Sequence, residues 1–167
     1  MWLIIKFDKS EINTLRYELM KKLGNDTVIF IPKVKIELFK KNNKTYSREI
    51  NLLGNYLFCY HRNFINMSNI NLLQYTKGVK YVLKEFLYSQ NNIKEFISKC
   101  RAHENKDGYI KPSFFDLNLN KKFKFLSGPF INFIFYVIDE NKSSFNIVLN
   151  KFKTTVSKEK YLFRPEV

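Results

Sequence analysis

The chain has 167 residues and a formal net charge of +14, and hydrophobic residues make up 45% of it, including 17 Phe and 10 Tyr. That length suits one domain or two small ones, and the aromatic content excludes a disordered chain. No apolar run approaches the roughly 20 residues of a membrane span, so we expect a cytoplasmic protein with no membrane contact. The charge favours a polyanionic partner, usually nucleic acid, although a genome biased toward Lys and Asn would produce the same composition.

The first hundred residues predict an α+β domain. Residues 2–7 read as a buried strand. An amphipathic helix follows, with Asp8 able to cap its start and Gly24 at its end. A second strand is expected at residues 28–31, before Pro32.

A basic hairpin is predicted next, from residues 34–39 and 46–50 around the polar turn 40–44. Residues 33–48 hold six basic residues and one acidic residue. A charged tip protects a sheet edge and aids solubility, and it also suits contact with nucleic acid; both interpretations stay open.

The rest of this domain contains a central strand within residues 52–60, after a bend at Gly54 and Asn55, a short helix at 68–73, a turn into a last strand at 76–82 and a helix at 93–100. Residues 101–116 are polar and read as a linker.

Five short strand-like runs follow the linker and predict a small β-barrel. They lie at residues 122–126, 133–139, 145–150, 154–156 and 161–163. Gly128 and Pro129 stand between the first two runs, where Gly can take the bend and Pro can stay outside the ladder.

No catalytic constellation is found in the sequence. His61 and His103 have neither metal-ligand nor triad spacing, and we expect His61 to be a surface or strand-end residue. Cys59 and Cys100 have no CxxC partners, so neither a zinc site nor a disulfide framework is predicted. We therefore expect an interaction protein, with no enzyme activity, cofactor or metal.

Three segments, in this order and spacing, resemble the NusG family of transcription elongation factors. They are GNYLF at residues 54–58, TKGV at 76–79, and GPF at 128–130 with Phe133. The resemblance implies a NusG-like N-terminal domain at residues 1–100, a linker at 101–116 and a KOW-like barrel at 117–167. The NYLF step is more similar to the specialised RfaH-like paralogs than to general NusG.

The resemblance implies a factor that binds the clamp helices of the largest RNA polymerase subunit, bridges the cleft and suppresses pausing or termination. The RfaH-like NYLF run further implies that this factor acts on particular operons. Tyr56 and Phe58 match the aromatic residues that pack on the clamp helices. Because they share one strand face while Leu57 and Cys59 share the other, we expect Leu57 and Cys59 in the core and both aromatics free for binding.

The same resemblance implies contact with non-template DNA through basic residues, at positions matched here by Lys9 and Lys77. Asp8 and Glu18 occupy two further positions of that surface and depart from the family pattern, which puts the recruitment sequence in doubt. Phe152 matches an exposed residue through which the KOW domain contacts a ribosomal protein of the small subunit or a termination factor. Packing in the barrel core is the alternative for Phe152.

RfaH-like proteins can fold the C-terminal domain as a helical hairpin instead of a barrel. Residues 145–149 and 154–156 are β-branched and Asn-rich, with poor helix propensity, so we predict the barrel. A monomer is expected. The alternative function is a KOW-type RNA-binding protein of the ribosomal or RNA-maturation class, which would explain the charge and the barrel but not the Tyr56 strand.

Overall fold

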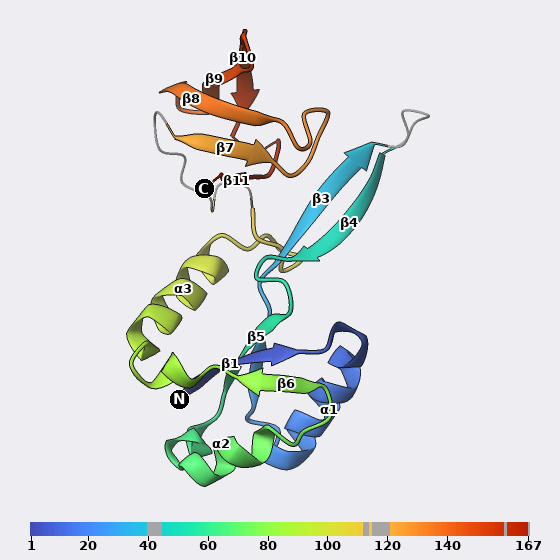
Figure 1. Cartoon of the computed structure of the whole chain (residues 1–167), viewed down its shortest axis with the longest axis vertical. Helices are drawn as coiled ribbons and strands as arrows, with labels where there is room; N and C mark the ends of the chain where they lie inside the picture. Colours follow the sequence, from blue (N-terminus) through green and yellow to red (C-terminus); the bar gives the residue numbers. More distant parts are fainter. Residues whose placement is uncertain (40–44, 112–113, 115–120, 159, 167) are drawn as a thin grey trace. The chain divides into compact units, whose positions relative to one another are not determined.

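The computed structural model describes residues 1–39, 45–111, 114, 121–158 and 160–166. The predicted hairpin tip at 40–44 and linker positions 112–113 and 115–116 lie outside these residues. The chain is an α+β protein, as predicted, and it divides into two compact units (Figure 1). The first unit is Met1–Pro32 with Asn51–Lys99, and the second is Lys33–Ile50 with Cys100–Val167. The domain boundaries derived from the sequence stay predictions.

The first unit is built on a four-stranded sheet with the order β2-β5-β1-β6. Its strands are β1 (Trp2–Phe7), β2 (Val28–Phe30), β5 (Tyr56–Tyr60) and β6 (Val79–Val82). Its helices are η1 (Lys9–Glu11), α1 (Ile12–Leu23), η2 (Arg62–Ile65), α2 (Met67–Leu73), η3 (Lys84–Leu87) and α3 (Gln90–Ala102). β1 pairs antiparallel with both β5 and β6.

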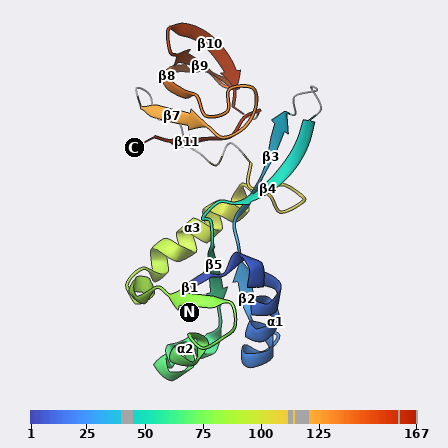
Figure 2. The same cartoon turned by 45° about the vertical axis from the view of Figure 1, so that its right-hand side comes forward.

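One face of this sheet forms the main core of the unit. Leu3, Ile5 and Phe7 alternate along β1, pair beside Leu57 and Cys59 of β5, and are fully buried. α1 and α2 cover this face, and each supplies buried leucine or isoleucine side chains (Figures 1 and 2). The expected core positions Leu57 and Cys59 are confirmed.

The opposite face of the sheet carries α3 (Figures 1 and 2). The Gln90 side chain accepts a hydrogen bond from the backbone N–H of Trp2 at 3.0 Å and donates one to the Trp2 carbonyl at 2.8 Å. These two bonds hold the first turn of α3 against β1. Phe96 of α3 packs on Phe58 of β5, with ring centroids 5.6 Å apart.

Most boundaries in this unit lie within one residue of the sequence-based expectations, and α3 differs most. β5 begins at Tyr56, because the chain turns just before it: the Gly54 N–H bonds the Asn51 carbonyl at 3.1 Å, and Gly54 has φ +60°. α3 begins three residues before the predicted residue 93, because the hydrogen bonds of Gln90 to the Trp2 backbone leave no mark on hydrophobic periodicity. None of the helices in the described part of the chain is both long and apolar enough to cross a membrane.

The second unit contains the predicted hairpin, β3 (Lys33–Phe39) with β4 (Thr45–Asn51). The segment after α3 folds back on its base: the Ile110 N–H donates to the Lys33 carbonyl at 2.8 Å, and Tyr109 hydrogen-bonds Glu49. Lys33 pairs with Glu49 at 3.3 Å. Part of the predicted linker is therefore ordered against the hairpin.

A five-stranded sheet with the order β10-β9-β8-β7-β11 completes the second unit. Its strands are β7 (Lys122–Phe125), β8 (Ile134–Glu140), β9 (Ser144–Leu149), β10 (Phe152–Ser157) and β11 (Phe163–Pro165). Phe145 of β9 and Phe163 of β11 have ring centroids 6.1 Å apart, although two strands separate them in the sheet order. A flat sheet would place them about 14 Å apart, so the sheet is rolled around its core, as predicted for a small barrel.

The loop between β7 and β8 is packed against the segment before β11. The buried Ser127 Oγ accepts a hydrogen bond from the Leu162 N–H at 2.8 Å. Gly128 has φ +81°, and a Cβ at this position would lie 2.3 Å from the Tyr161 ring. Glycine is thus required here both by the backbone conformation and by the close approach of Tyr161.

Candidate interaction site

The strongest candidate site lies on the α3 side of the first sheet, at the end of the sheet where β1, β5 and β6 meet. The registers place Lys6 opposite both Tyr56 and Tyr81. The two phenol oxygens share a hydrogen bond at 2.9 Å, and the Lys6 Nζ lies 5.2 Å and 5.4 Å from the two ring centroids. We call these three residues the tyrosine–lysine cluster.

The cluster is held by mutual electrostatic support. The Tyr81 hydroxyl, and then that of Tyr56, raise the pKa of Lys6, because both stabilise its ammonium form. The hydrogen bond from Tyr56 lowers the pKa of Tyr81. A cation over two aromatic faces, with Tyr81 41% exposed, offers a partner apolar ring area and one positive charge.

Phe58 does not extend this surface, and the expectation that it lies on a free face is wrong. Its side chain is only 4% exposed, because Phe30 of β2 and Phe96 of α3 pack on it at 6.2 Å and 5.6 Å between centroids. Tyr56, at the start of the same strand, is partly exposed. Strand alternation assigned the two residues to one face correctly, but a helix covers the part of that face around Phe58.

The TKGV element is a tight turn packed on the start of α1. Thr76 is buried, and its Oγ1 accepts a hydrogen bond from the Lys22 Nζ at 3.0 Å. Gly78 has φ +87°, and a Cβ there would lie 3.0 Å from the Leu15 Cβ. Lys77 is exposed and pairs with Glu11 at 3.7 Å. The glycine thus allows the turn to approach α1 closely while Lys77 points to solvent.

Lys9, the other basic residue matched to DNA contact, lies in the neighbouring η1 turn. The Asp8 N–H donates to the Gly78 carbonyl at 2.9 Å, which joins this turn to the TKGV turn. Asp8 also accepts from the Ser10 N–H and hydroxyl and pairs with Lys80 at 3.6 Å. The structure therefore brings the Lys9 and Lys77 turns together, with acidic side chains interspersed.

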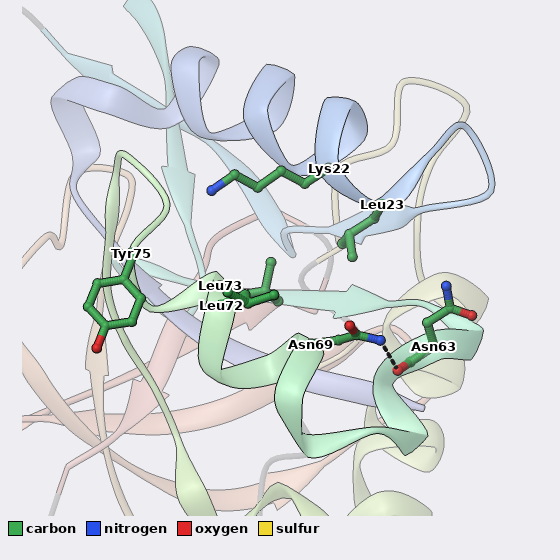
Figure 3. Close-up of a pocket in the computed structure, with 7 residues that line it drawn as sticks. All are labelled: Lys22, Leu23, Asn63, Asn69, Leu72, Leu73 and Tyr75. Atoms are coloured by element: carbon green, nitrogen blue, oxygen red, sulfur yellow. Dashed lines mark hydrogen bonds between the residues drawn. The ribbon is translucent and has the colours of Figure 1, made fainter.

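A groove of about 420 Å³ opens on the α1–α2 side of the first unit (Figure 3). Leu72 and Leu73 of α2 form its apolar part, with Lys22 of α1 extending along one wall. Asn69 donates to the Asn63 carbonyl at 3.1 Å at the far end. Leu23 and Tyr75 complete the lining, and the Tyr75 side chain is 87% exposed. Lys22 connects this groove to the TKGV turn through Thr76.

Phe152, the predicted contact residue of the second unit, is the first residue of β10 and is 77% exposed. The alternative of core packing is therefore wrong, while its binding role stays a prediction. Lys151 and Lys153 flank it in the sequence and are also exposed.

His61 is buried at 1% exposure and is a structural residue at the end of β5. Its Nδ1 accepts from the Asn63 N–H at 3.2 Å, so the Nε2 carries the proton and donates to Asp26 at 3.1 Å. This places His61 at a strand end, as expected, but not on the surface.

Burial raises the pKa of the Cys59 thiol to about 12. Within the described residues, no cluster of His, Cys, Asp and Glu side chains could hold a metal.

Lys6, Tyr81 and Lys22 take part in these surfaces but were not singled out from the sequence, and the same is true of the groove residues Asn63, Asn69, Leu72 and Tyr75. Lys6 had a signal, since it is the one charged residue in the apolar run of residues 2–7. Tyr81 and Lys22 had none, because their partners lie 25 and 54 residues away in the chain.

No model of a protein family matches the chain, and no curated protein matches it. The solved structures to which it is similar include a chain of the MjSpt4:Spt5 complex, with 10% sequence identity and a TM-score of 0.37. That alignment covers 99% of this chain and 98% of that chain. Thermotoga maritima NusG is 17% identical and covers 95% of this chain and 96% of that chain with a TM-score of 0.40. Likenesses this low carry no argument about function, so the α+β class rests on the strands and helices themselves.

Proposed function

We propose that the chain is a NusG-type transcription elongation and antitermination factor of the operon-specific, RfaH-like kind. It binds the clamp helices of the largest RNA polymerase subunit, bridges the cleft and suppresses pausing or termination. The single observation that carries this proposal is the tyrosine–lysine cluster. Its Tyr56 belongs to the strand whose NYLF run resembles the polymerase-binding strand of that family.

The cluster is suited to a helical protein partner. Tyrosine rings give large contact area at low entropic cost and are enriched among the residues that dominate binding energy. Lys6 adds a charge that an acidic side chain of the partner can meet. Tyr56 supplies the contact, and Phe58 supports the strand from beneath α3. Binding that favours one clamp state over another shifts the polymerase toward that state without any catalysis.

Contact with non-template DNA belongs to the Lys9 and Lys77 turns. The Lys22–Thr76 hydrogen bond joins the Lys77 turn to the groove, where the Tyr75 ring is open to solvent. A basic turn linked to an exposed ring suits a single strand. Glu11 beside Lys77 and Asp8 beside Lys80 weaken the local positive field. A contact limited to a few phosphates follows.

Phe152 is the proposed contact of the second unit with a small-subunit ribosomal protein or a termination factor. An exposed Phe between two exposed lysines is available for such an interface.

The test is a pull-down of the full chain with a clamp-helix fragment of the polymerase. Tyr56→Ala is expected to weaken binding by about 2 kcal/mol, roughly thirtyfold in Kd, as for an aromatic residue that dominates an interface. Tyr88→Ala is the matched control, since Tyr88 is 95% exposed in the same unit but outside the cluster. Phe58→Ala is unsuitable here, because it opens the buried side of the sheet. Binding that is absent, or indifferent to Tyr56, contradicts the proposal.

RNA binding by the chain, with no affinity for the clamp fragment, would favour the alternative function of a KOW-type RNA-binding protein.

The DNA contact is tested separately, by fluorescence anisotropy of a labelled single strand over a range of NaCl concentrations. Replacing both Lys9 and Lys77 by Gln is expected to reduce the slope of log K against log[salt] by about 1.4, or 0.7 per phosphate contact. The control replaces Lys94 and Lys142, which are exposed elsewhere, and makes the same change in net charge.

A further inference from the structure

The outer surface of the rolled sheet carries an apolar row that the core does not need. Along β8, Phe135 and Val137 point inward and are 1% exposed. Ile134, Tyr136 and Ile138 point outward, and each is 42% exposed. The solvated face of an antiparallel sheet ordinarily carries polar residues, so three outward apolar residues on a central strand mark a surface with a role of its own.

Lysines border this row on both sides. The register places Lys122 and Lys124 of β7 opposite Tyr136 and Ile134. On the other side, Tyr136 pairs with Val148 of β9, which in turn pairs with Lys153 of β10. The Lys122 Nζ lies 5.7 Å from the Tyr136 ring centroid.

The positive charge of this border is not neutralised within the described part of the chain, where none of the three lysines forms an ion pair. The nearest acidic residues along the row are at the end of β8. Asp139 accepts from the Glu140 N–H, and Glu140 is ion-paired with Lys158. On the β11 side, the Glu166 N–H bonds the Lys122 carbonyl at 3.0 Å, but the Glu166 carboxylate pairs with Arg164 at 3.9 Å, and Arg164 lies opposite Lys124. The surface is thus an apolar row between lysines that have no ion-pair partner among the described residues.

We propose that this surface binds an acidic amphipathic segment of a partner protein. The surface, called here the β8 outer face, consists of Lys122, Lys124, Ile134, Tyr136, Ile138 and Lys153. Apolar side chains of the segment cover the row, and its carboxylates face the lysines. The apolar row supplies most of the affinity, since exposed ion pairs contribute little, while the lysines set orientation and association rate.

This site is separate from Phe152 and from the polymerase contact. Phe152 pairs with the inward-facing Leu149, so it belongs to the opposite side of β10 from Lys153. The proposal therefore stands or falls independently of the function proposed above.

An acidic protein segment fits better than the other possible occupants. Single-stranded nucleic acid binds through stacking on aromatic rings, and only Tyr136 of the three row residues has a ring. A second copy of the chain would bring lysines against lysines, and each copy carries a net charge of +14. A partner with both apolar and acidic side chains satisfies both parts of the surface.

The test uses selection from a random peptide library displayed on phage, with the full chain as bait. The selected peptides are expected to be rich in Asp and Glu together with Leu, Phe or Trp. A synthetic copy of a selected peptide should bind the wild-type chain and bind the variant Ile134→Thr with Ile138→Thr at least about tenfold more weakly. Threonine keeps the β-branched shape that strands favour. Ile65→Thr is the matched control, since Ile65 is 83% exposed in the first unit.

The charge requirement is tested in the same assay. Replacing Lys124 and Lys153 by Gln should weaken peptide binding, and replacing both by Arg should preserve it. Amide signals of β8 in the wild-type chain should shift when the peptide is added, which locates the site without any variant that could unfold. The proposal is overturned if no peptide is selected, if the peptides are basic or uncharged, or if the shifts map elsewhere. Displacement of the peptide by oligo(dT), or dimerisation of the chain through this face, would also overturn it.

Discussion

The substitution Gly128→Ala gives the sharpest test of how the rolled sheet is held closed. A residue other than glycine at φ +81° costs about 1–2 kcal/mol. In addition, the new Cβ would lie 2.3 Å and 2.4 Å from two carbons of the Tyr161 ring, so the ring must leave its place. Tyr161 packs edge-on against Phe125 at 6.1 Å and Phe130 at 6.4 Å.

Each of these aromatic pairs is worth about 0.5–1.5 kcal/mol beyond burial. The expected destabilisation of the second unit is therefore about 2–5 kcal/mol. Gly108→Ala is the matched control, because Gly108 has φ +78° but a Cβ at that position would have no atom within 4 Å, and it should cost only the backbone part.

Hydrogen exchange of the β8 and β9 amides in the full chain measures this free energy locally. Fluorescence of the single Trp, at position 2 in the first unit, should stay unchanged and serves as an internal control. In a Tyr161→Ala background, Gly128→Ala should cost no more than the control substitution. Equal costs for the Gly128 and Gly108 variants in the wild-type background would refute the role assigned to the Tyr161 ring.

Three further outcomes are expected. Phe58→Ala should lower the free energy of unfolding of the first unit by about 3–5 kcal/mol, measured by urea titration with Trp fluorescence, and a cost typical of a surface residue would contradict its burial. The hydrogen bond from His61 lowers the pKa of Asp26, so this pair stabilises the fold above the usual aspartate pKa. That stabilisation is lost as the pH falls through the lower pKa of the folded state. Asp26→Asn should therefore flatten the loss of stability in urea titrations from pH 6 to pH 3, and an unchanged profile would count against the pair. Phe152→Ser should change the stability of the second unit by less than about 0.5 kcal/mol, as for a surface residue. The same hydrogen-exchange measurement checks this, and capture of the proposed partner should be abolished. Loss of protection in β9 would show that Phe152 supports the fold instead.

β7, β8 and β9 could be predicted to within one residue, because each has a short-range pattern. β10 begins two residues before the predicted 154, and β11 lies at Phe163–Pro165 instead of 161–163. Phe123 and Phe125 alternate with lysines, and Phe145 and Ile147 alternate with polar residues, so the period of two is visible locally. The exposure of Phe152 is not visible in such a pattern, because its register partner Leu149 is buried while Phe152 itself is exposed.

The covering of Phe58 could not be predicted in this way. Alternation says which residues share a face, but it does not say whether a distant helix packs on that face. The contact with Phe96 depends on α3, which Gln90 fixes to β1 across 88 residues of sequence. The tyrosine–lysine cluster likewise depends on the order β5-β1-β6, which no local pattern contains.

The pairing of β8 with β9 has one irregularity with a particular consequence. Val137 pairs with Ile147 and Asp139 with Asn146, so Ile138 is an extra residue with no counterpart on β9. If Ile138 were deleted, the two parts of the ladder would join directly, and every inward side chain would keep its place. A chain shortened by that one residue would keep the inward pairing, but it would lose an outward apolar side chain and the extra twist that a bulge gives a strand. One inserted residue thus changes the outer surface and the curvature of the sheet while it leaves the sequence of inward side chains intact.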